Sequence, residues 1–190
     1  DRFIQQEPDL SFSPGLLTEW GFTDDNKKVR MVVREGVKWH DGSDFTAEDV
    51  AWSLERAGDP ATGNPGQFVW KNLANFKVDG NVVTADVVQF EPTIFKWMAF
   101  LTGYVLPKAY YEKVGAEGFE KAPIGTGPYK LDAYERGAYM RLVANEDYWG
   151  GKPAFETVTI KFVPDAASRV AEIESGNAQV TMEIPYEEFD

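Results

Sequence analysis

The sequence predicts a mainly antiparallel α+β fold with interspersed helices, followed by the start of an α/β unit. Three observations favour it. Alternating apolar residues, interrupted by Glu-Gly and Asp-Gly turns, recur between residues 29 and 88 and are typical of hairpins. Residues 46–57 have the apolar spacing of an amphipathic helix. Residues 155–184 have the order strand, helix, strand, which is that of a βαβ unit with parallel neighbours.

Composition limits the function classes. The chain has 190 residues, 43% hydrophobic and 14% aromatic, which is enough for a packed core. Its formal net charge of −12 would repel phosphate backbones and anionic membrane surfaces, and no basic patch offsets it. We therefore expect no nucleic-acid partner. No apolar run is long enough to cross a bilayer, so no membrane insertion is expected. The absence of cysteine excludes disulfides and thiolate chemistry.

Turn signals predict three hairpins. The first joins residues 29–33 to residues 37–39 across a Glu-Gly turn. The second reverses at the Asp-Gly-Asn sequence 79–81, and the third spans residues 128–144. Each combines a short alternating run with a glycine that tolerates the backbone of a tight turn.

The helix at residues 46–57 has the clearest start signal. Thr46 is a good N-cap and Asp49, three positions later, can reach back to it in a capping box. Phe45 and Val50 occupy the two positions of a hydrophobic staple. The positions expected to be buried on one face are Ala47, Val50, Leu54 and Ala57.

Glycine and proline mark the remaining elements. Residues 58–67 predict a loop, and residues 93–103 are apolar almost all round, which predicts a short buried helix closed by Gly103. A further helix is expected from Pro107 to Gly115.

In the last part of the chain, residues 155–163 predict a strand with one apolar face. Asp165 is expected to cap a helix that runs through Ile173 and stops at Gly176. Residues 179–184 predict the closing strand of the βαβ unit.

His40 is the only histidine and stands beside Asp41. A catalytic triad needs a base, an orienting acid and a nucleophile within reach, whereas an aspartate before glycine in a tight turn usually bonds its own backbone. We interpret the pair as part of a turn and expect no catalytic residue. We favour a turn or packing role for His40 over a catalytic one.

Metal and phosphate sites are not indicated. One histidine without cysteine cannot supply a usual zinc ligand set, and the acidic clusters at 24–26 and 145–147 lack the spacing of a calcium loop. The "GTGP" sequence at 125–128 lacks the Lys-Ser/Thr pair of a phosphate-binding loop. We expect neither a metal nor a cofactor.

Residues 13–57 resemble the signature region of the family 5 extracellular solute-binding proteins, the peptide, opine and nickel receptors of ABC importers. "GVKWHDG" at 36–42 and "TAEDV" at 46–50 carry the resemblance. Further segments follow in the family's order, namely "VLPKAYYEKVG", "PIGTGPYKL" and residues 145–180. Several motifs in order are more specific than any one of them alone.

The resemblance implies a non-enzymatic receptor that binds a peptide or another small polar solute between two lobes and delivers it to a membrane permease. It implies a periplasmic or extracellular location, free or anchored to the cell envelope, and a periplasmic binding protein type II-like fold. Residues 1–121 would form the extra subdomain and residues 122–190 part of the first α/β lobe, with the second lobe outside this chain. The alternative is an enzyme or structural module that reuses the scaffold.

By position, Trp70 resembles the ligand-facing aromatic residue of the family, with core packing as the alternative. Phe68 is a secondary candidate. Thr102, Gly103 and Tyr104 are expected in a loop that reaches the cleft. The residues do not identify the ligand.

Overall fold

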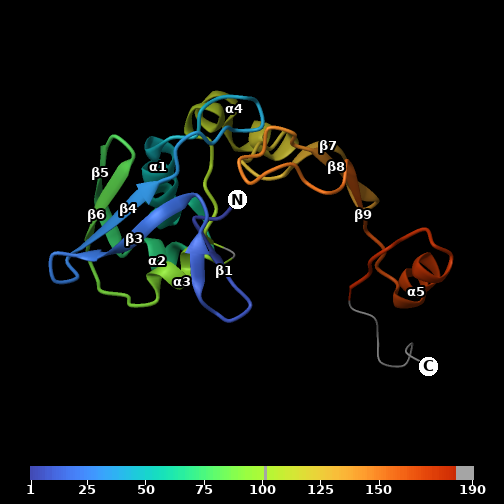
Figure 1. Ribbon diagram of the computed structural model, residues 1–190, viewed down its shortest axis with the longest axis horizontal. Coiled ribbons are helices and arrows are strands. Elements are labelled where there is room, and N and C mark those ends of the chain that lie inside the picture. The colour runs from blue at the N-terminus through green and yellow to red at the C-terminus, as the bar shows by residue number, and fades with distance from the viewer. Residues whose placement is uncertain (101, 183–190) are drawn as a thin grey trace. The chain divides into compact units, whose positions relative to one another are not determined.

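The computed structural model describes residues 1–100 and 102–182 of the chain (Figure 1). The chain divides into two compact units. The first consists of residues 1–130 and 145–153, and the second of residues 131–144 and the chain from 154 onward. The expected subdomain boundary after residue 121 stays a prediction.

The first unit contains a four-stranded antiparallel sheet in the order β3-β4-β6-β5. Its strands are β3 (Leu17–Thr23), β4 (Lys28–Val33), β5 (Leu73–Asp79) and β6 (Val82–Val87). The helix α1 (Ala47–Gly58) packs on β5 and β6. A separate hairpin pairs β1 (Ile4–Gln6) with β2 (Phe12–Pro14). The remaining helices are η1 (Pro60–Thr62), α2 (Gln67–Trp70), α3 (Ile94–Met98) and α4 (Lys108–Lys121).

One predicted hairpin is wrong. β4 does not pair with residues 37–39, because both of its edges are already taken by β3 and β6. Residues 37–39 instead pair with 43–45 across the Asp-Gly turn: Trp39 N donates to Ser43 O (2.8 Å) and Phe45 N to Val37 O (3.1 Å). The glycine turn after β4 was recognised correctly, but the partner of the strand was not.

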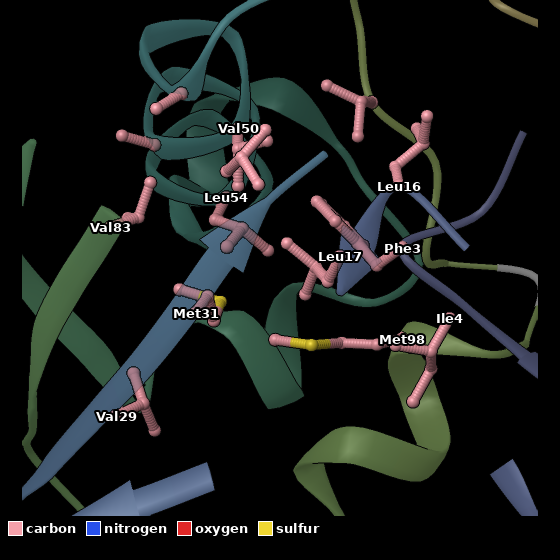
Figure 2. Packing of buried hydrophobic residues seen from close by; sticks show 14 of the residues in the cluster. Phe3, Ile4, Leu16, Leu17, Val29, Met31, Val50, Leu54, Val83 and Met98 are labelled. Atoms are coloured by element: carbon pink, nitrogen blue, oxygen red, sulfur yellow. The ribbon is translucent and has the colours of Figure 1, made fainter. Parts of the chain in front are cut away.

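The core lies between α1 and the sheet. All four positions predicted for the buried face of the helix are buried, as are alternate residues of β4 and β6. Figure 2 shows Val50 and Leu54 of α1 close to Met31 of β4, with Met98 of α3 in the same cluster. Full burial of such a side chain contributes about 1.5–3 kcal/mol, so this cluster is a main source of stability.

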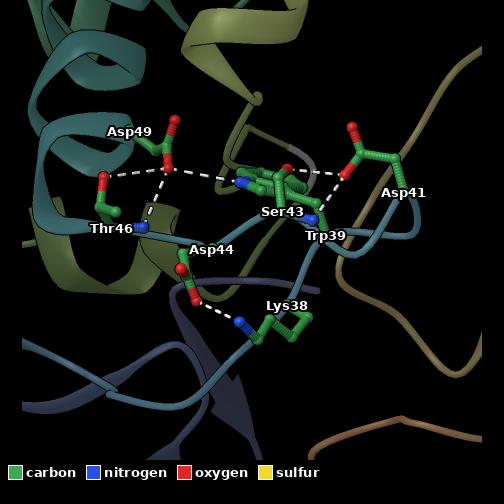
Figure 3. A network of polar contacts seen from close by, with 7 residues as sticks. All are labelled: Lys38, Trp39, Asp41, Ser43, Asp44, Thr46 and Asp49. Atoms are coloured by element: carbon green, nitrogen blue, oxygen red, sulfur yellow. Dashed lines mark hydrogen bonds and ion pairs between the residues drawn. The ribbon is translucent and has the colours of Figure 1, made fainter.

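A buried carboxylate joins the start of α1 to two other segments, of which Figure 3 shows the 37–45 hairpin. One Asp49 oxygen accepts hydrogen bonds from Thr46 N (2.9 Å), the Thr46 hydroxyl (3.2 Å) and Trp39 Nε1 (3.3 Å). The other accepts from Lys108 N (2.9 Å), at the start of α4. The capping box is confirmed, and the structure adds that Asp49 also holds the 37–45 hairpin and α4.

The turns and helix ends predicted at glycines are largely confirmed. The hairpin at 79–81 is confirmed, with Gly80 at a φ of 58°. The short helix predicted within 93–103 corresponds to α3. Gly115, at a φ of 71°, breaks α4 as expected, but helical structure resumes after it and continues to Lys121. The stop was therefore predicted, and the resumption was not.

The second unit carries most of a three-stranded sheet in the order β7-β8-β9. Its strands are β7 (Tyr129–Glu135), β8 (Tyr139–Ala144) and β9 (Thr157–Lys161), and β8 and β9 are antiparallel. The helix α5 (Ala166–Glu174) begins as predicted, with the Asp165 carboxylate accepting from Ser168 N (2.8 Å).

The predicted closing strand of the βαβ unit is wrong for residues 179–182, and residues 183 and 184 lie outside the described residues. A strand needs the N–H and C=O groups of a neighbour, and no described strand pairs with 179–182. Val180 and Met182 are exposed. The predicted fold class, a mixture of helices with mainly antiparallel sheets, is confirmed.

We expect Asp49→Ala to lower the free energy of unfolding by about 3 kcal/mol, because it leaves buried donors on three segments without an acceptor. Thr46→Ala should cost about 1 kcal/mol, as for the loss of an N-cap. Urea unfolding followed by circular dichroism measures both. The exposed neighbour Glu48 provides the control, since Glu48→Ala should change stability by less than about 0.5 kcal/mol. Equal costs for Asp49→Ala and Glu48→Ala would contradict the role assigned to the carboxylate.

Candidate functional site

Both ring nitrogens of His40 bind backbone groups of the "GTGP" loop. Nδ1 accepts from Gly125 N (3.1 Å), and Nε2 lies 3.0 Å from Gly127 O and therefore carries the proton. His40 N also donates to Gly125 O (2.8 Å). The imidazole is thus a neutral link between segments 85 residues apart in the chain.

Asp41 does not orient this ring. Its carboxylate accepts from the backbone N (3.0 Å) and the hydroxyl (2.6 Å) of Ser43, which closes the turn (Figure 3). With both imidazole nitrogens engaged by backbone, His40 offers no free position for a general base. The predicted turn and packing roles of His40 and Asp41 are confirmed.

Burial lowers the pKa of His40 below its ordinary value of 6.5. The charge of Lys130, whose ammonium donates to His40 O (3.1 Å), also lowers this pKa, whereas the hydrogen bond to Gly127 and the charge of Asp41 raise it. The net effect favours the neutral ring. A proton on Nδ1 would point at the Gly125 N–H and break that hydrogen bond.

The motifs after residue 123 also make structural contacts. Asn145 donates through its side chain to Gly127 O (3.1 Å) and through its backbone to Pro128 O (2.8 Å). Tyr148 and Trp149 donate to the carboxylate of Asp1, at 3.1 and 2.8 Å. These residues hold segments of the first unit together. Among the described residues, no group of three or more acidic or histidine side chains is arranged to hold a metal ion.

Trp70 is completely buried, and its ring lies edge-on to Phe3 with 6.5 Å between ring centroids. Its indole N–H has no hydrogen-bond partner among the described residues. The ring therefore has the core position that the sequence left as the alternative. Its contact with a solute stays a prediction.

Exposed aromatic side chains lie next to this part of the core. Phe68 and Phe100 are each 52% exposed, and Trp97 packs between them, with ring centroids 5.1 Å from Phe68 and 6.2 Å from Phe100. We call Phe68, Trp97 and Phe100 the aromatic surface. Only Phe68 was expected from the sequence. For the other two, the apolar character of α3 on all sides predicts burial, whereas Trp97 is half-buried and Phe100 is exposed.

The loop after α3 lies against the start of the chain. Gly103 O accepts from Phe3 N (3.2 Å), and a Cβ on Gly103 would lie 2.1 Å from Met98 O, so only glycine fits. Tyr104, 49% exposed, forms a β-bridge with Arg2. The Thr102 side chain lies against Gly66, just before α2. The structure thus brings the expected loop and the α2 segment together.

Arg2 is a residue that sequence reasoning missed. Its guanidinium donates to Ala99 O (2.8 Å) and lies 5.8 Å from the centre of the Tyr104 ring. Nothing in the local sequence around Arg2 indicates this contact, because its partners are about 100 residues away.

An open depression of about 350 Å³ lies elsewhere, between the end of α1 and β5. Glu55, Lys71 and Phe76 are among its lining residues, and none of the expected site residues takes part. In the described part of the chain, no helix combines the length and the apolar character needed to cross a bilayer.

Residues 11–190 match the family model described as bacterial extracellular solute-binding proteins, family 5 Middle. The chain belongs to this family. The expected family is confirmed, and its extracellular character agrees with the expected location outside the cytoplasm.

Two curated relatives are each 32% identical to this chain. The dipeptide-binding protein of Escherichia coli K12 aligns with 91% of this chain and 36% of its own length. The glutathione-binding protein GsiB of E. coli O1:K1 aligns with 91% of this chain and 34% of its own. The chain therefore spans about a third of the length of the curated relatives it matches.

Solved structures show the same fold. NikZ from Campylobacter jejuni, in complex with Ni(L-His), superposes with a TM-score of 0.85 at 26% identity, over 93% of this chain and 36% of NikZ. The oligopeptide-binding protein AppA from Bacillus subtilis, in complex with a nonapeptide, gives 0.82 at 26% identity over the same shares. The expected relation to periplasmic binding proteins is confirmed.

We expect the free energy of unfolding to decrease as the pH is lowered from 7.5 to 5.5, because of His40. The unfolded chain binds a proton on this residue near its ordinary pKa of 6.5, whereas the folded chain, with its lowered pKa, does so only at lower pH. In this range the unfolded state binds more protons, so the free energy of unfolding decreases as the pH falls.

His40→Ala should cost about 2 kcal/mol at pH 7.5 and flatten the dependence on pH. Urea unfolding at pH 7.5, 6.5 and 5.5 measures both effects. Asp41→Asn serves as the control, because it leaves the imidazole in place and should keep most of the slope. An unchanged slope in His40→Ala would show that another group titrates.

Proposed function

We propose that this chain is part of the substrate-binding component of an ABC importer, which captures a peptide or similar small polar solute in a cleft between two lobes and delivers it to a membrane permease. The family match over residues 11–190 carries the proposal. The catalytic alternative finds no support in His40, whose ring nitrogens are both bound to backbone.

The relatives narrow the class of solute. By name they bind dipeptides and glutathione, and the solved structures hold a nonapeptide, Ni(L-His) or the opine mannopinic acid. These ligands are small, polar and rich in amide or carboxylate groups. We infer a solute of this kind for the present protein.

Within this chain, the aromatic surface together with Tyr104 and Thr102 is the best candidate for one wall of the cleft. Binding sites of this type combine apolar and aromatic area with a few oriented polar groups. Phe68, Phe100 and Tyr104 are each about half exposed, which makes them accessible to a solute. Trp70 would support this wall from below, since it lies on the same α2 segment as Phe68.

The assignment of residues 1–121 to the extra subdomain and of 122–190 to part of the first lobe belongs to the same proposal. The second lobe would supply the opposite wall. Because a cleft receptor excludes water only when both walls contact the ligand, affinity should require both.

The test compares the 190-residue chain with a longer version of the protein that carries both lobes. We expect isothermal titration with di- to pentapeptides to show binding by the longer version, and at least about a hundredfold weaker binding by the 190-residue chain. Micromolar binding by the short chain would contradict the two-wall argument. Failure of the longer version to bind any peptide, opine or metal chelate would refute the function.

In the longer version, Phe100→Ala should weaken binding by about fivefold, the effect of one lost aromatic contact. Phe155, 68% exposed and located in the second unit, gives a matched control: Phe155→Ala should leave the affinity unchanged. Equal effects of the two substitutions would argue against the aromatic surface as a wall of the cleft. Trp70→Phe, titrated in parallel, tests whether the buried indole contributes.

A further inference from the structure

Arg2 is a partly buried cation without an acidic partner in the described part of the chain. Its guanidinium donates one hydrogen bond, to Ala99 O (2.8 Å), and lies over the Tyr104 ring. None of the ion pairs found among the described residues includes it. The groups that contact its charge are a carbonyl oxygen and an aromatic ring, and not a carboxylate of these pairs.

The backbone holds Arg2 in place. Its carbonyl accepts from Leu16 N (3.1 Å), and the residue forms a β-bridge with Tyr104. The next two residues, Phe3 and Ile4, belong to the core. The guanidinium therefore projects from a rigid segment, which reduces the conformational entropy lost when it binds a partner.

Arg2 is linked to the aromatic surface through Ala99, the residue that ends α3. Arg2 binds the carbonyl of Ala99, which directly precedes Phe100 in the chain, and the Phe100 ring packs on Trp97. The two features complement a ligand that carries a negative charge next to an apolar group. The positive charge is fixed and the apolar area is exposed, so each can act on a solute without rearrangement.

We propose that Arg2 and the aromatic surface form a subsite for a solute with a free carboxylate beside an aromatic or aliphatic side chain, as at the C-terminus of a short peptide ending in Leu or Phe. The inference rests on the proposed function and names its substrate class. A guanidinium has five N–H groups, and the described contacts use one of them. The remaining donors suit a bidentate bond to a carboxylate, and the side chain of the same residue would lie on the aromatic rings.

The experiment uses the longer protein that carries both lobes. Isothermal titration with Ala-Ala-Leu and with its C-terminal amide gives the ratio of the two dissociation constants. We expect the free acid to bind at least about tenfold more tightly, as for a charge-assisted hydrogen bond. A third peptide, Ala-Glu-Leu amide, places the carboxylate on a side chain instead. It should bind like the plain amide if the C-terminal carboxylate is the group recognised.

Substitutions of Arg2 test whether this residue causes the preference for the free acid over the amide. Arg2→Gln should reduce the ratio to less than about threefold, and Arg2→Lys should keep part of it, because an ammonium retains the charge without the fork geometry. Arg30→Gln is the matched control, since Arg30 lies on β4 and is paired with Glu19. It should leave the ratio unchanged. Because acid and amide are compared on the same variant, a modest loss of stability does not alter the readout.

The aromatic part of the subsite is tested by changing the side chain of the last residue of the peptide. Phe100→Ala should weaken binding of Ala-Ala-Leu severalfold more than binding of Ala-Ala-Gly. Equal acid and amide affinities in the unchanged protein, or a full preference for the acid in Arg2→Gln, would overturn the subsite and leave the receptor function standing. Absence of binding by any solute class would instead refute the proposed function itself.

Discussion

The carboxylate of Asp49 is the contact on which the first unit depends. It accepts hydrogen bonds from Thr46 at the start of α1, from the Trp39 indole and from Lys108 at the start of α4. Asp49 is only 7% exposed, so these donors could not turn to water if it were lost. One side chain thereby fixes the start of α1 and the neighbouring hairpin, as Figure 3 shows, and also the start of α4.

The motifs that mark the family are structural in this chain. His40 and Asn145 both bind Gly127 O, and the aromatic pair Tyr148 and Trp149 binds the Asp1 carboxylate. These contacts join segments that lie far apart in the chain. Each of them requires a side chain that can bind a backbone atom or donate a hydrogen bond. A scaffold held in this way leaves the exposed loops free to differ, which is consistent with the varied ligands named for the relatives.

Binding chemistry in this chain is expected where α2, α3 and the chain start meet. Trp70 belongs to the core of that region, whereas Phe68 and Phe100 reach its surface. The difference follows from two-residue spacing on the short helix α2, which turns one ring inward and the other outward. Arg2 adds a charge that no carboxylate of the described ion pairs neutralises.

The sequence by itself indicated the family, through several motifs in order along the chain. It also determined local structure: the capping box at Thr46 and Asp49, the hairpin turn at 79–81 and the break at Gly115. Each depends on residues within a few positions of one another. Only the tertiary structure decided the partners of β4, the absence of a strand at 179–182, the two ring contacts of His40, and the exposure of Phe100 next to the residue whose carbonyl Arg2 binds. These depend on contacts between residues up to 100 positions apart, where burial and the supply of hydrogen-bond partners, not local propensity, select the arrangement.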